Sequence, residues 1–184
     1  MSDSIKSLIS IIESEDFQES FSSWSKILAD LIWETKISSK LVTLFGNGGS
    51  AADSQHWSAE LMCTFRNRTR PPIPAIALTT DTSVLTAWSN DFDFSTAFLR
   101  QIEALDQING LSIGMSTSGK SRNVLLALGN ARSRGAKTVL ISGSSVQEND
   151  NFDIHVILPS SNTPTVQTLT QMLYHEVCIN LEDR

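Results

Sequence analysis

The chain has 184 residues, long enough for one domain with a substantial core. Hydrophobic residues make up 40% and charged residues 18%, an ordinary globular balance, and a net charge of -6 without a basic block disfavours non-specific nucleic-acid binding. Two cysteines show neither zinc-finger nor disulfide-framework spacing. The acidic, amphipathic start lacks signal-peptide features, and no stretch approaches the ~20 apolar residues of a membrane span, so we expect a cytoplasmic protein.

The spacing of apolar residues predicts an α/β fold. Residues 5–35 follow a helical period, which indicates two helices or one broken near Asp16. Five nearly continuous apolar runs are typical of strands buried on both faces of a parallel sheet: 41–45, 74–79, 111–116, 137–143 and 152–159. The helices predicted after them are 51–66, 82–89, 94–106, 121–134 and 164–182. Ligands of such a sheet bind beyond the carboxyl ends of the strands.

A glycine-rich loop follows the first predicted strand, at residues 46–50. Its spacing fits neither the Walker motif nor GxGxxG, which disfavours a nucleotide. The loop would instead let a sugar lie against the backbone, with Asn47 and Ser50 offering polar contacts. His56 and Glu60 follow one helical turn apart on one face, although such a pair alone is more often a surface pair.

A second polar loop, residues 116–121, follows the third predicted strand and precedes a helix. It holds four hydroxyl side chains and Gly119, which allows close backbone approach. A helix N-terminus offers unpaired N–H groups and partial positive charge, so this loop is a candidate phosphate site. The plainer interpretation is a turn in which Ser118 or Ser121 caps the helix.

Three motifs together carry a family resemblance. FGNGGSAADSQHWSAEL, STSGKS and NDF at 90–92 resemble sugar isomerase (SIS) domains, and more narrowly the bacterial sedoheptulose 7-phosphate isomerases, also called phosphoheptose isomerases. The likeness covers essentially the whole chain as a single SIS domain, with N-terminal helices in 1–38 and an α/β core in 39–184. It implies a flavodoxin-like five-stranded parallel sheet flanked by helices, and a homotetramer with active sites at subunit interfaces.

The resemblance also implies a function and its residues. The reaction is aldose–ketose isomerisation of a phosphorylated sugar, sedoheptulose 7-phosphate to glycero-manno-heptose 7-phosphate, with one zinc per subunit, for lipopolysaccharide heptose. The family's catalytic positions match Glu60 and His175, and its metal ligands match His56, Glu60, Gln167 and His175. The substrate-binding positions are Asn47, Gly48, Gly49, Ser50, Asp91, Ser116, Thr117, Ser118, Ser121 and Gln167.

Those residue types suit the chemistry. Moving a carbonyl between neighbouring carbons needs groups that remove and deliver a proton, and a metal can polarise the carbonyl. Taken alone, His175 beside Tyr174 is equally well a partly buried structural histidine. His155, inside an apolar run, is given no function, Trp57 and Trp88 are expected to pack, and Cys63 is expected to be buried.

Several positions depart from the family pattern. Thr64 stands where the family has an arginine, which Arg66 or Arg68 could replace, and Thr168 stands where it has a glutamate. Pro164 and Thr165 also differ, Pro164 suiting a first helical turn capped by Thr163 or Asn162. Two alternatives therefore stay open: an isomerase for a different phosphosugar, or a non-catalytic SIS tetramer that binds a protein such as the replication initiator.

Overall fold

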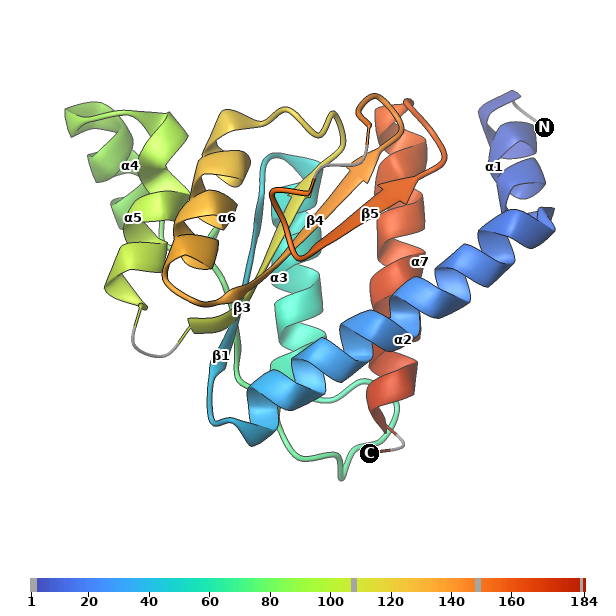
Figure 1. Cartoon of the computed structure of the whole chain (residues 1–184), viewed down its shortest axis with the longest axis horizontal. Coiled ribbons are helices and arrows are strands. Elements are labelled where there is room, and N and C mark those ends of the chain that lie inside the picture. Colours follow the sequence, from blue (N-terminus) through green and yellow to red (C-terminus); the bar gives the residue numbers. More distant parts are fainter. Residues whose placement is uncertain (1–2, 107–108, 148–149, 183) are drawn as a thin grey trace.

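The computed structural model describes residues 3–106, 109–147, 150–182 and 184. After two N-terminal helices, helices separate the strands, except that no described helix lies between the last two strands (Figure 1). The helices are α1 (Asp3–Glu13), α2 (Glu15–Ile37), α3 (Gly49–Met62), α4 (Thr82–Asp91), α5 (Ala97–Ala104), α6 (Arg122–Ser133) and α7 (Thr163–Glu182). The strands are β1 (Leu41–Gly46), β2 (Ala75–Ala77), β3 (Asn109–Ser116), β4 (Lys137–Gly143) and β5 (Ile154–Leu158).

The sheet is parallel, in the order β2-β1-β3-β4-β5. This is the doubly wound order of flavodoxin-like folds, so the predicted fold class is confirmed. The loop at residues 46–50 is called the glycine loop and the loop at residues 116–121 the hydroxyl loop. Because β1 and β3 are neighbours and Gly46 pairs with Met115, these two loops leave the sheet side by side. The topology thus joins the two loops that the sequence singled out.

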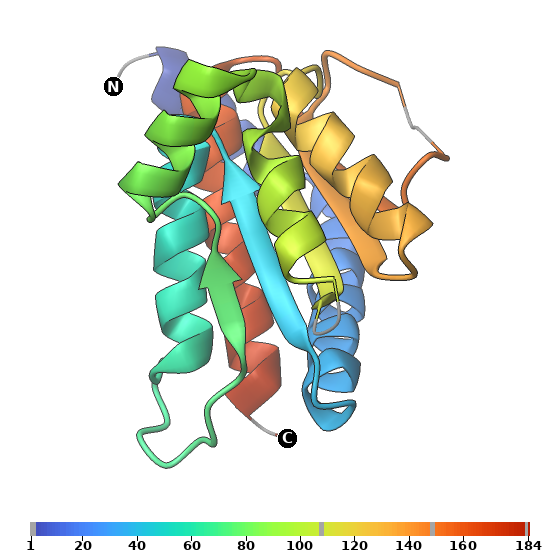
Figure 2. The same cartoon turned by 90° about the vertical axis from the view of Figure 1, so that its left-hand side faces the viewer.

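Helices cover both faces of the sheet (Figures 1 and 2). On one face α2, α3 and α7 bury a core that includes Trp57, Leu169 and Tyr174. On the other, α5 and α6 pack against Phe45 and Leu140. The face that matters for function is the first, because it places α3 against α7.

The predicted break in the N-terminal helical region lies at Ser14. Its side chain accepts a hydrogen bond from Phe17 N at 3.3 Å and caps α2, while α1 ends one residue earlier. A serine cap at the start of an apolar period is the local reason for two helices rather than one. Among the described helices, none is both long and apolar enough to span a bilayer.

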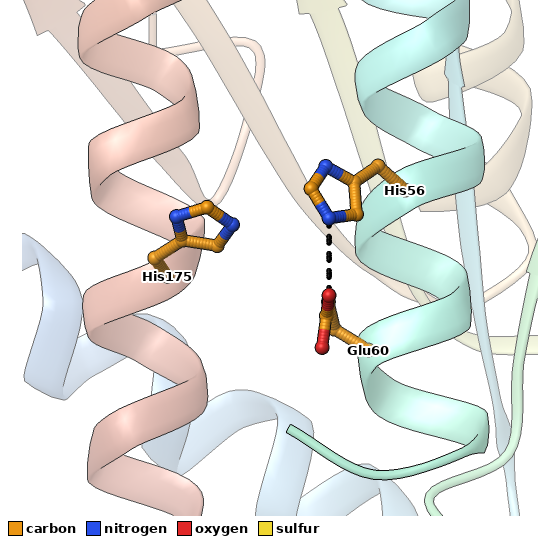
Figure 3. Close-up of side chains that lie close together, drawn as sticks. All are labelled: His56, Glu60 and His175. Carbon is orange, nitrogen blue, oxygen red and sulfur yellow. Dashed lines mark hydrogen bonds and ion pairs between the residues drawn. The ribbon is translucent and has the colours of Figure 1, made fainter. Parts of the chain in front are cut away.

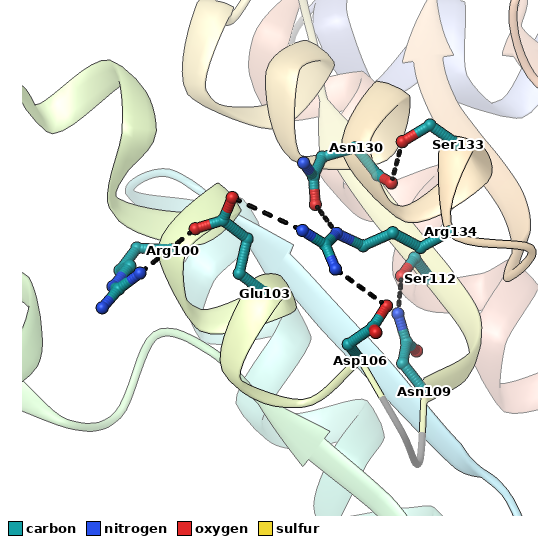
Figure 4. Close-up of polar contacts among 8 residues, drawn as sticks. All are labelled: Arg100, Glu103, Asp106, Asn109, Ser112, Asn130, Ser133 and Arg134. Atoms are coloured by element: carbon teal, nitrogen blue, oxygen red, sulfur yellow. Dashed lines mark hydrogen bonds and ion pairs between the residues drawn. The ribbon is translucent and has the colours of Figure 1, made fainter.

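A polar network closes the end of the sheet opposite the two loops (Figure 4). Arg134, after α6, makes ion pairs with Asp106 at 3.2 Å and Glu103 at 3.7 Å. Buried Asn109 donates to Ser112, whose hydroxyl also contacts Thr43 at 2.8 Å. These contacts fasten α5 to α6 and β1 to β3 away from the site.

Some predicted boundaries were wrong. The run 74–79 forms only the three-residue edge strand β2, and the helix expected over 94–106 starts with a 3₁₀ turn at Phe94–Thr96. α3 ends at Met62, which leaves Cys63 on an exposed turn instead of in the core as expected. Trp57 packs as predicted and is fully buried.

Candidate active site

A pocket of about 300 Å³ lies where β1 and β3 end. It is lined by Asn47, Gly48, Gly49, Ser50, Met115, Ser116, Thr117, Ser121, Thr163 and Gln167. Three segments far apart in the sequence therefore form it: the glycine loop, the hydroxyl loop and the start of α7. Eight of the predicted substrate-binding residues line this pocket.

Two helix N-termini contribute to this pocket. α3 starts after Gly48, whose φ of 56° is a left-handed conformation that glycine adopts without strain, and α6 starts after Ser121. In the described structure neither end receives a capping bond from its N-cap side chain. The Ser121 hydroxyl instead accepts a hydrogen bond from Ser116 at 2.9 Å. Two positive helix ends suit an anionic ligand.

Asn123, which the sequence analysis missed, joins the two loops. Its side-chain amide donates to Asn47 Oδ1 at 2.8 Å, and the Asn47 amide donates back to Asn123 Oδ1 at 2.9 Å. Asn47 was expected to contact sugar, but here its amide is engaged by Asn123. No local motif reveals such a pairing, because the two residues are 76 positions apart.

Gly49 makes room for Gln167. A Cβ atom at Gly49 would lie 2.1 Å from Nε2 of Gln167. The Gln167 side chain therefore lies against the glycine loop and lines the pocket. It precedes His175 by about 12 Å of helix rise along α7.

His56, Glu60 and His175 converge between α3 and α7 (Figure 3). Nε2 of His56 lies 3.0 Å from Oε1 of Glu60, and one ligand atom of each of the three residues lies within 4.8 Å of the others. The side chains of His56 and Glu60 are 42% and 19% exposed, so the cluster is open to a ligand. The predicted one-turn pair is thus joined by a histidine that comes 115 residues after Glu60 in the sequence.

The donor set of this cluster fits a zinc ion. Two imidazole nitrogens and a carboxylate oxygen are usual zinc ligands, and tetrahedral zinc needs them roughly 3.4 Å apart. The present separations of up to 4.8 Å exceed that value, so the side chains have to move closer together to bind the ion. Burial, followed by the neighbouring His56, lowers the pKa of His175, which favours the neutral imidazole that binds metal.

Asp53 lies one turn before His56 on α3 and is half-buried. Within the described part of the chain its Oδ2 is buried and has no hydrogen-bond partner. Burial raises the pKa of Asp53 to about 6, and His56 opposes this in part. A half-buried carboxyl group with a raised pKa thus accompanies the cluster, and the sequence analysis did not identify it.

Arg70 supports the end of α3 from below the cluster. It is only 6% exposed, and Nη2 donates to the backbone oxygens of Glu60 at 2.7 Å and Leu61 at 3.0 Å. Arg66 and Arg68, the suggested replacements for the family arginine, are exposed. At the end of α7, Glu182 accepts the backbone N–H of Asn67 at 2.6 Å. The loop after α3 is therefore tied to both helices of the cluster.

Other predicted positions lie apart from the pocket. Asp91 is exposed at the end of α4 and accepts a hydrogen bond from Asn90, and exposed Ser118 accepts one from Lys120 N. Neither lines the pocket described above. Asn162 is the cap expected near Pro164, because its Oδ1 accepts from Thr165 N at 3.2 Å. Thr168, where the family has a glutamate, donates to its own helix.

Comparisons with known proteins agree with this fold. Residues 12–143 match the SIS domain family. The phosphoheptose isomerase of Nitratiruptor is 45% identical over 145 residues, 78% of this chain and 77% of that protein. That of Aliarcobacter butzleri is 43% identical over 165 residues, 89% and 85% of the two chains. The solved phosphoheptose isomerase of Neisseria gonorrhoeae superposes with a TM-score of 0.83 at 28% identity, covering 98% of this chain and 95% of that one.

The fold and the matched segment define an SIS-domain protein. Within that class, the chain belongs to the phosphoheptose isomerase family. It is therefore an aldose–ketose isomerase that acts on a phosphosugar. These relatives favour the enzyme over the protein-binding alternative.

Proposed function

We propose that this enzyme interconverts sedoheptulose 7-phosphate and glycero-manno-heptose 7-phosphate. The observation that carries the proposal is the course of α3, which starts at the pocket with two helix N-termini and brings His56 and Glu60 to His175. From Ser50 to His56 the helix rises about 9 Å, and to Glu60 about 15 Å. An extended seven-carbon sugar with a terminal phosphate suits that distance, with its phosphate in the pocket and its reacting carbons at the His56, Glu60 and His175 cluster.

The phosphate end is assigned to the pocket. Backbone N–H groups that open α3 and α6 donate to phosphate oxygens, and the hydroxyls of Ser116, Thr117 and Ser121 add neutral donors. Gly48 and Gly49 let the ligand approach the backbone, while Ser50 and Gln167 line the wall. Asp91 and Ser118 are the remaining substrate-binding positions that the family resemblance implies. Their contact with the substrate would require a rearrangement or a neighbouring subunit.

The proton transfer is assigned to Glu60 and His175. One of the two groups removes a proton from the carbon next to the carbonyl, which gives an enediol. The other group transfers the protons of the hydroxyl groups. A proton then returns to the carbon that carried the carbonyl. Oε1 of Glu60 lies 3.0 Å from Nε2 of His56, and proton transfer is assigned to the second oxygen of this carboxylate. A neutral His175, favoured by its lowered pKa, can accept a proton.

The metal is assigned as one zinc held by His56, Glu60 and His175, with Gln167 as the fourth ligand after its side chain turns from Gly49. Bound zinc would supply a Lewis acid that polarises the sugar carbonyl. The chain's own contribution is to hold the two imidazoles and the carboxylate close together on two packed helices.

The setting is assigned from the family resemblance. The whole chain would act as one SIS domain in a cytoplasmic homotetramer that supplies heptose for lipopolysaccharide. Exposed apolar side chains on α1, Ile5 at 49% and Ile9 at 38%, offer surface for subunit contact. A neighbouring subunit would then complete active sites at the subunit interfaces, as the family resemblance implies.

Isomerisation in D₂O tests the mechanism directly. Proton transfer through an enediol places solvent deuterium at C2 of the aldose to the extent that the proton on the base exchanges with solvent, whereas a hydride shift places none there. Glu60→Gln and His175→Ala should each lower kcat by about 10²–10⁴-fold. His155→Ala is the matched control, because that histidine bonds Ser142 on β4, away from the cluster. Near-wild-type rates in both site variants would refute the assignment.

A different phosphosugar is the second candidate. It is favoured by Thr168, whose uncharged side chain is bonded to Pro164 O where the family has a carboxylate, and by exposed Thr64 in place of an arginine. Comparing kcat/KM across ketose phosphates of five to seven carbons decides between the two. A preference for a shorter sugar would overturn the heptose assignment while leaving the isomerase chemistry intact.

A further inference from the structure

Tyr174, the chain's only tyrosine, lies between the two halves of the cluster and has no role in the proposed function. It is 1% exposed, and its Oη lies 2.8 Å from Nδ1 of His56. Its ring stacks on buried Trp57, with centroids 5.6 Å apart and planes 20° apart. The ring is thus held by packing, and its hydroxyl is directed at the imidazole.

The hydrogen bonds around His56 define the direction of each proton. A carboxylate can only accept, so Glu60 Oε1 at 3.0 Å requires the hydrogen on Nε2 of His56. The neutral ring then has a lone pair on Nδ1, and the Tyr174 hydroxyl must donate to it. Both ring nitrogens are therefore engaged, one from α3 and one from α7.

We propose that Tyr174 is the positioning residue of His56, holding the ring by Nδ1 so that Nε2 faces the Glu60–His175 cluster as its metal-binding atom. A hydroxyl can donate or accept, because its hydrogen rotates. When Nε2 gives up its hydrogen to bind a metal, the hydrogen moves to Nδ1 and Tyr174 becomes the acceptor. The same two atoms, Oη of Tyr174 and Nδ1 of His56, thus stay hydrogen-bonded in the free and in the loaded site. This inference rests on the metal assignment above for its loaded state only.

The packing of Tyr174 makes this role specific. Its ring also meets the ring of the adjacent His175 edge-on, with centroids 4.8 Å apart, and His56 meets His175 at 5.3 Å. A phenylalanine would keep these ring contacts and lose only the hydroxyl. Partners of this kind around a ligating histidine typically change metal affinity by about 10–100-fold.

The matched pair of variants is Tyr174→Phe and Thr170→Val. Thr170 is a buried residue one turn earlier on α7, and its hydroxyl bonds Val166 O at 2.9 Å, so its removal also costs one buried hydroxyl but leaves His56 untouched. We expect the zinc dissociation constant to rise at least about tenfold in Tyr174→Phe and to stay within about twofold in Thr170→Val. Equal affinities in Tyr174→Phe and wild type would overturn the proposal.

A metal-free readout separates this proposal from the function. Imidazole ¹⁵N NMR of the metal-free chain should show His56 with its hydrogen on Nε2, which Glu60 fixes, and the Nδ1 resonance should shift in Tyr174→Phe because Nδ1 loses its hydrogen bond. An unchanged Nδ1 resonance in a folded variant contradicts the positioning role. If the wild-type chain binds no zinc yet Tyr174→Phe shifts the Nδ1 resonance, the metal assignment fails and the positioning role is supported.

The wild-type chain provides a test that needs no variant. With ¹³Cζ-tyrosine labelling, one resonance reports Tyr174. It should shift and saturate at one equivalent of zinc, as the hydroxyl changes from donor to acceptor. A tyrosine resonance that stays fixed while the His56 signals respond to zinc would overturn the proposal even if Tyr174→Phe fails to fold.

Discussion

Nη2 of Arg70 donates to the backbone oxygen of Glu60 at 2.7 Å, so a buried cation ends the helix that presents the proposed catalytic carboxylate. The C-terminal end of a helix has unpaired carbonyls and partial negative charge, and a guanidinium satisfies both. The same group binds Leu61 O and Pro71 O, the latter at 3.0 Å. Arg70 therefore fixes the backbone at Glu60, from which the Glu60 side chain projects.

Replacing Arg70 with methionine should destabilise the fold. Carbonyls that lose a buried charged donor cost about 1–3 kcal/mol each, so we expect a loss of about 2–4 kcal/mol in the free energy of unfolding, measured in urea. Arg70→Lys keeps the charge without the planar fork and should recover only part. Arg68→Met, at an exposed position in the same loop, should change stability by at most about 0.5 kcal/mol. Equal effects at both positions would contradict this role.

Replacing Gly49 with alanine should weaken substrate binding. The new Cβ would meet the end of the flexible Gln167 side chain, which can move aside, so the chain still folds while the pocket wall changes. We expect KM to rise by roughly tenfold, the value of one lost hydrogen bond of about 1.4 kcal/mol.

Gly129→Ala provides the control for Gly49. It lies within α6, and a Cβ there would meet nothing within 4 Å. Alanine should stabilise the helix by about 0.5–1 kcal/mol and leave KM unchanged. An unaltered KM in Gly49→Ala would show that the position of Gln167 does not affect substrate binding.

The raised pKa of Asp53 predicts how the free energy of unfolding depends on pH. Because burial raises its folded pKa from 3.8 to about 6, the folded state binds more protons than the unfolded state between these values. Its contribution is therefore greatest below about pH 4 and is lost as pH rises through 6. Asp53→Asn should melt at higher temperature than wild type above pH 6, with the difference vanishing near pH 4. A difference that grows on acidification would show the opposite sign of shift.

Metal removal should expose the proposed zinc site. Chelator-treated protein should lose activity, and zinc should restore it and raise the melting temperature, since a ligand at one hundred times its dissociation constant stabilises by about 2.7 kcal/mol. His56→Ala should abolish the zinc-dependent rise, whereas His155→Ala should retain it. A zinc-dependent rise that survives in His56→Ala would relocate the metal.

Local patterns in the sequence determined much of the fold. Continuous apolar runs indicated a covered parallel sheet. Capping chemistry, which acts within three residues, placed the start of α7 at Thr163 or Asn162, of which Asn162 is the cap. The break between the first two helices was expected near Asp16 and lies at Ser14. The hydroxyl loop at 116–121 was likewise recognised from its composition and its place before a helix.

Only the tertiary structure decided what meets across the fold. An apolar period shows which face of a helix is covered, but not which element covers it. The contacts of Tyr174 with His56 and of Asn123 with Asn47 join residues 118 and 76 positions apart. The pKa of Asp53 depends on burial created by that packing, and the burial of Arg70 rather than Arg66 or Arg68 depends on where α3 ends. The sequence by itself thus determined the chemistry available, and the packing of α3 against α7 decided how it is arranged.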